Sequence, residues 1–441
     1  MEHATSATGG SVQREVGKIA AASFVGTALE WYDYFLYGSA SALVFDKLFF
    51  PSLDPAIGVI AAFTTFAVGF CARPIGAAFF GHFGDRYGRK RTLIATVVLM
   101  GVCTGGIGLL PTYQSIGVAA PILLTALRFL QGFSVGGEWS GAMLLTIEHA
   151  PVRRRNVFAS LVQQGSPVGT LLSSGALALV VLLPDDQLLA WGWRLPFLAA
   201  FLLLAVGLYL RLRVEESPLF QRVLAENRQQ RVPVATALRT VPLRMLVGIG
   251  APLIVVGGFY LMTTYVISYG HNTLGLSRSL MLDATLVAAG VEMCVLAFFG
   301  RLADRITHWR VCAIGSLVSL LVAFPVFALI DTKVPALVII GVAIGVGALS
   351  IPYAPMGPML SEMFPDETRY SAVALSYNLS GVVSGFVPLI AAAVFRASGQ
   401  ASWSIAGLLA LIGLVSLVGA LTASLALRRH RYAYVETPAA K

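Results

Sequence analysis

Gly81-His82-Phe83-Gly84-Asp85-Arg86-Tyr87-Gly88-Arg89-Lys90-Arg91 is the stretch that decides the fold. Its eleven residues hold five charged side chains and three glycines. Apolar runs flank it at 57–80 and 92–110, and each has about the 20 residues that a helix needs to cross a bilayer core of ~30 Å. The stretch is therefore a basic hairpin between two membrane helices, and its positive charge predicts the cytoplasmic side.

A second copy argues against a loop that only sets topology. Residues 300–305 repeat the Gly-x-x-x-Asp-Arg core at an offset of 219 residues. The pattern Glu-x-x-Pro-x-x-x-Arg also occurs twice, at 148–155 and 362–369, at an offset of 214 residues. Two motifs in the same order at nearly the same offset predict two homologous halves, an architecture found in many secondary transporters.

The composition indicates a polytopic helical membrane protein. Of the 441 residues, 57% are hydrophobic and 12% are charged, and the mean hydropathy is +0.78. The net charge of +9 does not indicate nucleic-acid binding, because the basic residues are spread over the loops. The four cysteines fall in or beside apolar runs, without the spacing of a disulfide framework or a metal site.

We predict twelve transmembrane helices in two pseudo-symmetric six-helix halves. The predicted regions are a cytoplasmic tail at 1–17, the first half at 18–213, a linker at 214–243, the second half at 244–427 and a cytoplasmic tail at 428–441. The linker contains a short interfacial helix or is a flexible connection. Of the Lys and Arg residues, 24 fall on the side of the basic hairpin and 5 on the other, which predicts that both termini are cytoplasmic.

Ionisable residues within the spans are expensive in a bilayer and tend to mark ion or substrate paths. Glu30 and Asp33 are three residues apart, so they share one helix face, and two acids on one face suit a proton carrier. Asp33 and Arg128 lie at comparable depth, so they can form an ion pair. That pair is either part of the proton coupling or a permanent structural contact. Glu292 receives no role.

The motifs resemble those of the major facilitator superfamily. Residues 29–34 (Leu-Glu-Trp-Tyr-Asp-Tyr), 72–76 (Ala-Arg-Pro-Ile-Gly), 136–139 (Gly-Gly-Glu-Trp) and 216–220 (Glu-Ser-Pro-Leu-Phe) are similar to its bacterial metabolite:proton symporters, whose substrates include shikimate, α-ketoglutarate and proline or betaine. The resemblance covers nearly the whole chain. It implies that Arg128 occupies a proton-coupling arginine position and Asp33 a helix-1 proton site. We therefore expect protonation of Asp33, alone or shared with Glu30, to release Arg128, which then either binds a substrate carboxylate or permits the helices to move.

Two further groups of residues are candidates. Polar side chains in the middle of helices are candidate substrate contacts: Arg128, Gln163, Gln164, Tyr260, Tyr265, Tyr353, Tyr377 and Asn378. Residues of the repeated motifs and their neighbours are candidates for a cytoplasmic gate, unless they are simply placed at the interface: Gly81, Asp85, Arg86, Gly88, Arg89, Glu138, Glu148, Arg155, Asp304, Arg305, Glu362 and Arg369. Arg73 is assigned to the same gate network, without a definite role.

We therefore expect a monomeric, multi-pass transporter of the bacterial inner membrane that imports a small organic metabolite, such as shikimate or a related acid, by proton symport. The proton is the coupling ion, and no metal or other cofactor is expected. A drug or metabolite antiporter, an uncoupled uniporter and a sensor on a transporter fold remain alternatives. No catalytic motif is present, which argues against an enzyme.

Overall fold

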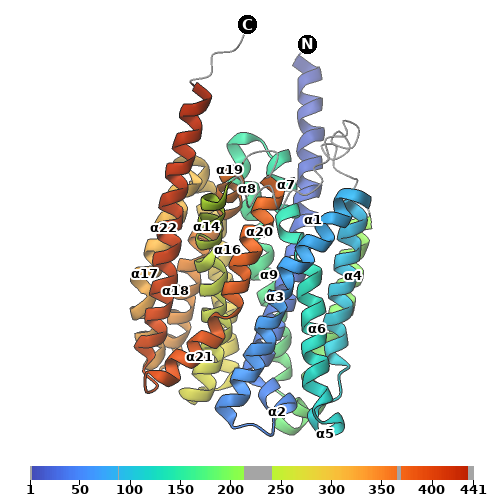
Figure 1. The fold of residues 1–441 in the computed structure, drawn as a ribbon, viewed down its shortest axis with the longest axis vertical. Helices are drawn as coiled ribbons and strands as arrows, with labels where there is room; N and C mark the ends of the chain where they lie inside the picture. Colours follow the sequence, from blue (N-terminus) through green and yellow to red (C-terminus); the bar gives the residue numbers. More distant parts are fainter. Residues whose placement is uncertain (1, 88, 213–240, 365–368, 436–441) are drawn as a thin grey trace.

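The computed structural model describes residues 2–87, 89–212, 241–364 and 369–435, and this part of the chain is helical with no β-strand. The long helices run along the long axis of the molecule (Figure 1). The first half contains α1 (Glu2–Leu43), α3 (Pro55–Tyr87), α4 (Arg89–Gly108), α6 (Ala119–Val135), α7 (Glu138–His149), α8 (Arg155–Gln163), α9 (Gly165–Val180) and α11 (Arg194–Leu212). The short helices α2 (Phe45–Phe49), α5 (Tyr113–Ile116) and α10 (Asp185–Gln187) connect them.

The second half begins with α14 (Pro242–Gly250), which continues through π-helical turns and α15 (Val266–Ser268) to Thr273. It then contains α16 (Arg278–Ile306), α17 (His308–Asp331), α18 (Pro335–Tyr353), α19 (Met356–Met363), α20 (Arg369–Gly385), α21 (Val387–Ala397) and α22 (Ser402–Val435). The break between α18 and α19 falls at Pro355, because proline lacks the N–H that an uninterrupted helix requires.

Each of the twelve predicted spans corresponds to one helix or to consecutive helices. Among the described residues, 9 helices are long and apolar enough to cross a membrane, and Ile94–Gly108 is a shorter apolar helix. The fold prediction is confirmed. Two boundaries differ, because α1 already begins in the predicted tail and α22 extends to Val435. Extending an existing helix needs no new nucleation, so a helix readily runs past the membrane-spanning part. Most of the predicted linker, 213–240, lies outside the described residues.

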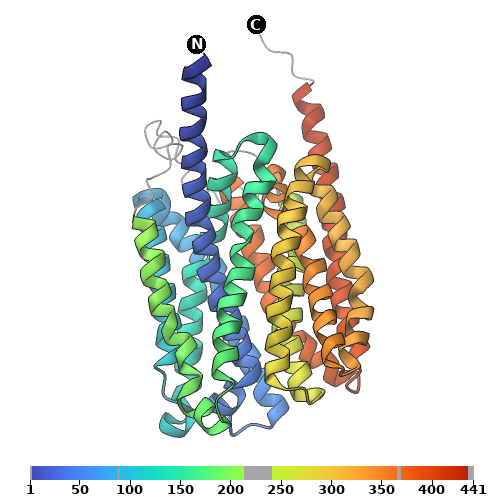
Figure 2. The same ribbon diagram turned by 180° about the vertical axis from the view of Figure 1, so that it is seen from behind.

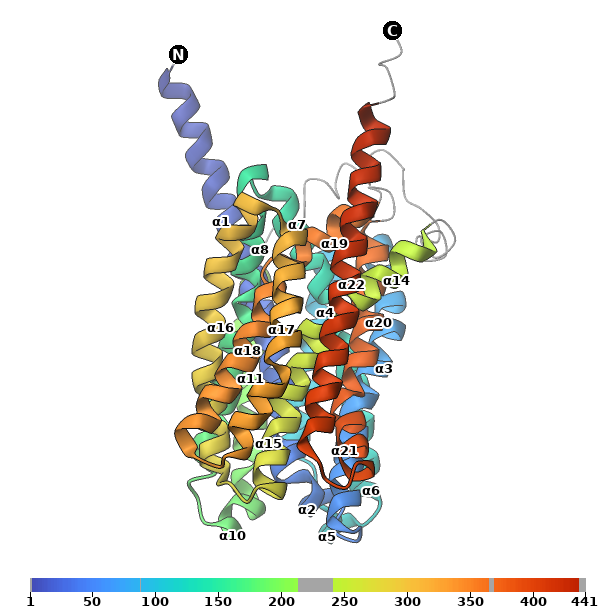
Figure 3. The ribbon, with the colours of Figure 1, turned by 90° about the vertical axis from the view of Figure 1, so that its left-hand side faces the viewer.

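Both termini lie at the same end of the bundle (Figure 3). The halves meet along two seams. Along one seam, α3 packs against α20. Along the other, α8 and α9 pack against α16, and Figure 2 shows these helices side by side, in green and yellow. Within the first half, a Cβ atom on Gly132 would fall on the carbonyl of Gly69, so the backbones of α6 and α3 are in direct contact there. Small residues permit this close approach, and it places Arg128 beside α3 and α1.

Candidate functional site

One face of α1 carries the side chains around which the site is built. Glu30, Asp33, Tyr34 and Tyr37 follow the i, i+3, i+4, i+7 spacing of residues on one helix face. All four are buried, because α1 runs inside the first half against α3, α9 and α11. This face therefore points into the protein and not toward lipid.

Asp33 lies in a four-residue network. Its Oδ1 accepts hydrogen bonds from Thr104 Oγ1 at 2.5 Å and from Gln131 Nε2, and its Oδ2 lies 3.5 Å from Arg128 Nη1. Arg128 Nη1 also donates to Gln131 Oε1 at 2.7 Å. The structure thus places the predicted acid beside the predicted arginine. Sequence analysis missed Thr104 and Gln131, although Gln131 stands three residues after Arg128, on the same face of an apolar helix.

Arg128 is fully buried and surrounded by aromatic rings. Its Cζ lies 4.3 Å from the ring centroid of Tyr37 and 5.1 Å from those of Tyr34 and Phe66. These contacts are cation–π interactions, which hold a guanidinium without neutralising it. Nη1 makes the hydrogen bonds to Asp33 and Gln131, whereas Nε and Nη2 have no hydrogen-bond partner among the described residues. A buried guanidinium with unused donors can receive an oxyanion.

Glu30 faces a different arginine. Arg73 Nη2 lies 3.5 Å from Glu30 Oε1, and Arg73 Nε donates to the Tyr34 hydroxyl at 3.0 Å. The Arg73 guanidinium also lies over the rings of Tyr34 and Phe70, at 4.3 and 4.5 Å. Arg73 therefore pairs with Glu30, and its membership of the gate network stays a prediction. It stands about 12 Å along α3 from the basic hairpin, at 1.5 Å per residue.

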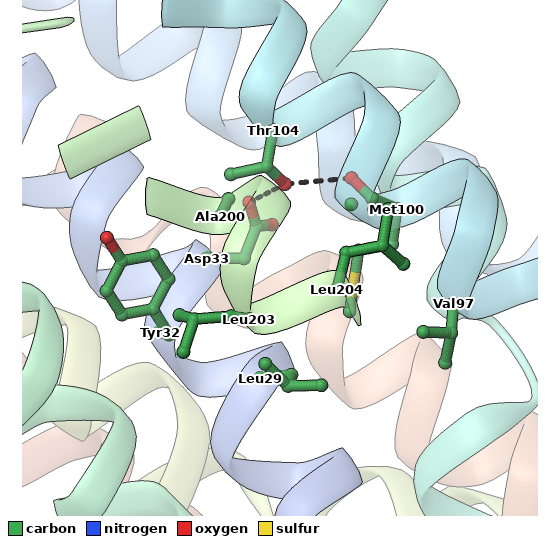
Figure 4. Close-up of a pocket in the computed structure, with 10 residues that line it drawn as sticks. Leu29, Tyr32, Asp33, Val97, Met100, Thr104, Ala200, Leu203 and Leu204 are labelled. Carbon is green, nitrogen blue, oxygen red and sulfur yellow. Dashed lines mark hydrogen bonds between the residues drawn. The ribbon is translucent and has the colours of Figure 1, made fainter. Parts of the chain in front are cut away.

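A small cavity of about 20 Å³ lies beside Asp33 (Figure 4). Its walls come from α1, α4 and α11, and they consist of Leu29, Tyr32, Asp33, Val97, Met100, Gly101, Thr104, Ala200, Leu203 and Leu204. This volume is enough for one water molecule, which needs about 10–15 Å³ and polar partners such as Asp33 and Thr104. A water here would reach Asp33 from within the first half, away from the seams.

The predicted tyrosine contacts are buried, but they divide between three places: the centre for Tyr260 and Tyr353, and one end of the bundle each for Tyr377 and Tyr265. Tyr260 packs against Phe66 and Phe70, with ring centroids 5.3 and 5.0 Å apart. Tyr353 packs edge-on against Trp31 at 6.1 Å. These two line the centre, next to the ion pairs.

The remaining predicted substrate contacts join the halves. Gln163 accepts a hydrogen bond from Trp139 Nε1 at 3.2 Å and donates to the Tyr353 carbonyl at 3.4 Å. Gln164 Nε2 donates to the Met293 carbonyl at 2.9 Å. The bonds to the Tyr353 and Met293 carbonyls connect the end of α8 and its junction with α9 to α18 and α16 of the second half.

A second set of contacts closes the bundle at the end that carries the termini. The rings of Trp139 and Tyr377 stack at 3.7 Å with an interplanar angle of 11°. Asn378 Nδ2 donates to the Gly136 carbonyl at 2.5 Å. Because these residues belong to α7, α20 and the junction of α6 with α7, both contacts must break before the halves can part here.

Asp304, from the second copy of the Gly-x-x-x-Asp-Arg motif, caps a helix of the other half. Its Oδ1 accepts from Asn156 N at 3.0 Å and from Asn156 Nδ2 at 2.8 Å, and its Oδ2 accepts from Val157 N at 3.3 Å. These groups lie in the first turn of α8, where backbone N–H groups have no intrahelical acceptor and the helix dipole favours a negative charge. Asp304 thereby connects α16 to α8.

The other predicted gate residues occupy varied positions. Glu362 Oε2 lies 3.4 Å from His308 Nε2, and Arg369 Nε donates to the Ser361 carbonyl at 2.8 Å. Glu138 is buried at the start of α7, Arg155 is half-buried, and Glu148 and Arg305 are exposed. Gly81, Asp85, Arg86, Gly88 and Arg89 lie outside the described residues, since either the residue or its side chain is not described.

The halves also touch at the opposite end. Arg278 Nη1 at the start of α16 forms a 2.7 Å ion pair with Asp185 of α10. Phe63 of α3 packs against Tyr265 with ring centroids 6.4 Å apart. Nearby, burial raises the pKa of the Asp46 carboxyl, while the backbone of Lys47 and the charges of Lys47 and Arg278 lower it. With contacts at both ends and buried arginines between them, the described residues adopt an occluded arrangement.

We expect Asp304→Ala to loosen the seam between α8 and α16. Losing a helix cap costs about 1 kcal/mol, which changes an equilibrium about fivefold. The reporter is Ser160→Cys in a cysteine-free background, because Ser160 is buried in α8 against Gly300. Its maleimide labelling should be about fivefold faster in the Asp304→Ala variant. The exposed neighbour, Arg305→Ala, should leave the rate unchanged, and equal rates in both variants would contradict the capping role.

Comparisons with known proteins agree with this architecture. A family model described as Major Facilitator Superfamily matches residues 23–332 and 293–440. The shikimate transporter of Escherichia coli (strain K12) is 41% identical over 382 residues, which cover 86% of this chain and 87% of that protein. The proline/betaine transporter of the same strain is 35% identical over 394 residues, or 86% of this chain and 78% of that protein. A crystal structure of a D-xylose-proton symporter aligns with a TM-score of 0.72 at 19% identity, covering 91% of this chain and 97% of that one, and shows the likeness of fold.

Proposed function

Because this chain belongs to the major facilitator superfamily and is a membrane transporter, not an enzyme, we propose that it imports a small organic carboxylate by proton symport with alternating access. A substrate related to shikimate is favoured by the 41% identity to the shikimate transporter of Escherichia coli. The observation that carries the proposal is Arg128, a buried guanidinium that pairs with Asp33 and keeps two nitrogens without a partner among the described residues.

The proposed coupling follows from this geometry. While Asp33 is ionised, it holds Nη1 of Arg128. Protonation removes the negative charge, so the guanidinium becomes an uncompensated buried cation, which is costly unless an anion replaces the lost partner. A substrate carboxylate supplies that anion. Proton and substrate therefore favour each other's binding, and this mutual dependence is the requirement for symport.

Aromatic side chains define the rest of the proposed substrate site. Tyr260 and Tyr353 reach the centre from the second half, and Tyr34 and Tyr37 line it from α1. Aromatic walls with a few polar groups suit a small ring-bearing acid, because rings provide apolar contact and hydroxyls fix orientation. Gln163 links this centre to the Trp139–Tyr377 stack, so occupancy of the centre can affect closure of that end.

The cellular placement is part of the proposal. The excess of Lys and Arg on the side of the termini supports a cytoplasmic location for both termini in a bacterial inner membrane. The opposite end, with the Arg278–Asp185 pair, then faces outward. We propose a monomer in which each chain transports independently.

The experiment that tests this function is uptake into proteoliposomes. Labelled shikimate, α-ketoglutarate, citrate and betaine are offered with and without an inward proton gradient. Accumulation of one acid that requires the gradient supports proton symport. Equal accumulation in both conditions indicates a uniporter, and uptake driven by an outward gradient indicates an antiporter. Preference for betaine over all three acids would contradict a substrate related to shikimate, because betaine carries a quaternary ammonium group beside its carboxylate.

A further inference from the structure

A second acid lies at the centre of the bundle with no role in the mechanism above. Glu292 is at the midpoint of α16, and its side chain is fully buried. Neither carboxyl oxygen accepts a hydrogen bond of normal geometry from a described residue, and the nearest donor is the hydroxyl of Ser166. Glu30 and Asp33 each have an arginine, but no ion pair of Glu292 occurs in the described part of the chain. This difference separates Glu292 from Glu30 and Asp33.

The surroundings of Glu292 provide no positive charge. The hydroxyl of Ser166 in α9 lies close enough to interact with the carboxyl. The elements that pack on α16 include α8, α9, α17, α18, η1 (Val152–Arg154) and η5 (Tyr269–Thr273). Their ionisable side chains are Arg153 and Arg154 in η1, Arg155 at the start of α8, Tyr353 at the end of α18, His308, Arg310, Cys312 and Asp331 in α17, and Tyr269 and His271 in η5. Of these, Tyr353 interacts electrostatically with Glu292 and is neutral.

Burying a carboxylate without a cation or strong hydrogen-bond donors costs far more free energy than burying a protonated carboxyl. A buried acid avoids this cost by binding a proton, which makes it neutral. In the occluded arrangement Glu292 must therefore carry a proton. In water the same carboxyl would lose it at neutral pH.

The position of Glu292 connects this proton to movement. The acid lies where α16 of the second half packs against α9 of the first. Gln164, at the junction of α8 and α9, donates to the carbonyl of Met293, the next residue after Glu292. The Oε1 atom of Gln164 has no partner among the described residues. When the halves part along this seam, water reaches the carboxyl and the proton can leave.

We propose that Glu292 is a second proton-binding site, which takes up a proton before the seam between α9 and α16 closes and releases it when the seam opens. The step is a simple proton exchange with water, and no other bond changes. It deepens the proposed symport, on which it rests, because closure of the seam then requires a proton at Glu292 in addition to the one at Asp33. A permanently ionised Glu292 would keep the seam from closing.

The test has a spectroscopic arm that does not depend on transport. Infrared spectra of the full-length protein in nanodiscs at pH 8 are compared for wild type and Glu292→Gln, which replaces the carboxyl with a neutral amide of similar shape. The wild type should show a protonated-carboxyl carbonyl band that Glu292→Gln lacks. The band should weaken in Asp304→Ala, in which the seam is loosened. Absence of the band from wild type, or a band that is unchanged when the seam is loosened, overturns the proposal.

The transport arm measures the coupled protons in the same variants. With the membrane potential clamped at zero, each coupled proton concentrates substrate about tenfold per pH unit. Glu292→Gln should therefore lower the limiting accumulation about tenfold at a gradient of about one pH unit, while exchange at equal pH continues. The control is Asp283→Asn, an exposed acid of the same helix, which should accumulate substrate like wild type.

The infrared and transport measurements together distinguish failure of the proposed symport from failure of the proposed proton site at Glu292. Wild-type uptake that does not depend on the gradient contradicts the proposed symport. In that case the infrared band and its response to Asp304→Ala show by themselves whether Glu292 binds a proton when the seam is closed. Gradient-driven uptake with the same accumulation in wild type and Glu292→Gln overturns the second proton site and leaves symport through Asp33 intact. In that case Glu292 is a permanently neutral carboxyl within the protein.

Discussion

Asp33→Asn lowers the gradient-driven accumulation of substrate about tenfold per pH unit while exchange at equal pH continues. Asparagine keeps the shape of the side chain and can still accept from Thr104, but it cannot bind and release a proton. It also leaves Arg128 permanently available to a carboxylate, as protonated Asp33 would. Each lost coupled proton lowers the accumulation limit about tenfold per pH unit, and the proton at Glu292 remains, so the variant should concentrate substrate about tenfold less than wild type at a gradient of about one pH unit.

The measurement is the steady-state ratio of labelled substrate across proteoliposomes at a fixed proton gradient, together with counterflow at equal pH. Asp283→Asn makes the same acid-to-amide change on an exposed position and should retain wild-type accumulation. If Asp33→Asn still concentrates substrate as wild type does, Asp33 is not a coupling site. Loss of both uptake and counterflow would instead assign Asp33 to substrate binding or folding.

Arg128→Lys should weaken substrate binding by roughly 30-fold to several thousand-fold, since breaking a buried, hydrogen-bonded charge pair costs about 2–5 kcal/mol. Lysine keeps the positive charge, but it loses the planar fork that holds Asp33 and Gln131 with one nitrogen and leaves two others for a carboxylate. It also loses part of the stacking on the Tyr37 ring. The effect should therefore appear in the equilibrium dissociation constant, measured on purified protein.

Arg194→Lys is the matched control, because Arg194 donates to the carbonyls of Gly108 and Leu110 away from the centre. It should bind substrate like wild type. If Arg128→Lys does not fold, the double variant Asp33→Asn/Arg128→Gln removes both charges of the buried pair and avoids an unpaired one. Wild-type affinity in either Arg128 variant would refute carboxylate binding by this arginine.

Much of the fold followed from the sequence, because its signals are local and repeated. Apolar runs of membrane-spanning length fix the helices, and the two copies of Gly-x-x-x-Asp-Arg, at 81–86 and 300–305, fix the relation of the halves. The aligned faces of Glu30 and Asp33 follow from helix periodicity alone. Part of the candidate site, Asp33 with Arg128, could also be predicted from the sequence, because a charge buried in a membrane span requires a partner.

Only the tertiary structure decided which partners meet. Helix periodicity tells which residues share a face, but not how far each helix is rotated toward its neighbours. That rotation is set by packing, here by the contact of Gly69 with Gly132, which brings α3 and α6 together around the α1 face. This packing pairs Glu30 with Arg73 and Asp33 with Arg128. It leaves Glu292 buried at the seam between the halves without a cation among the described residues. These contacts join residues far apart in the sequence, and their geometry depends on the whole bundle.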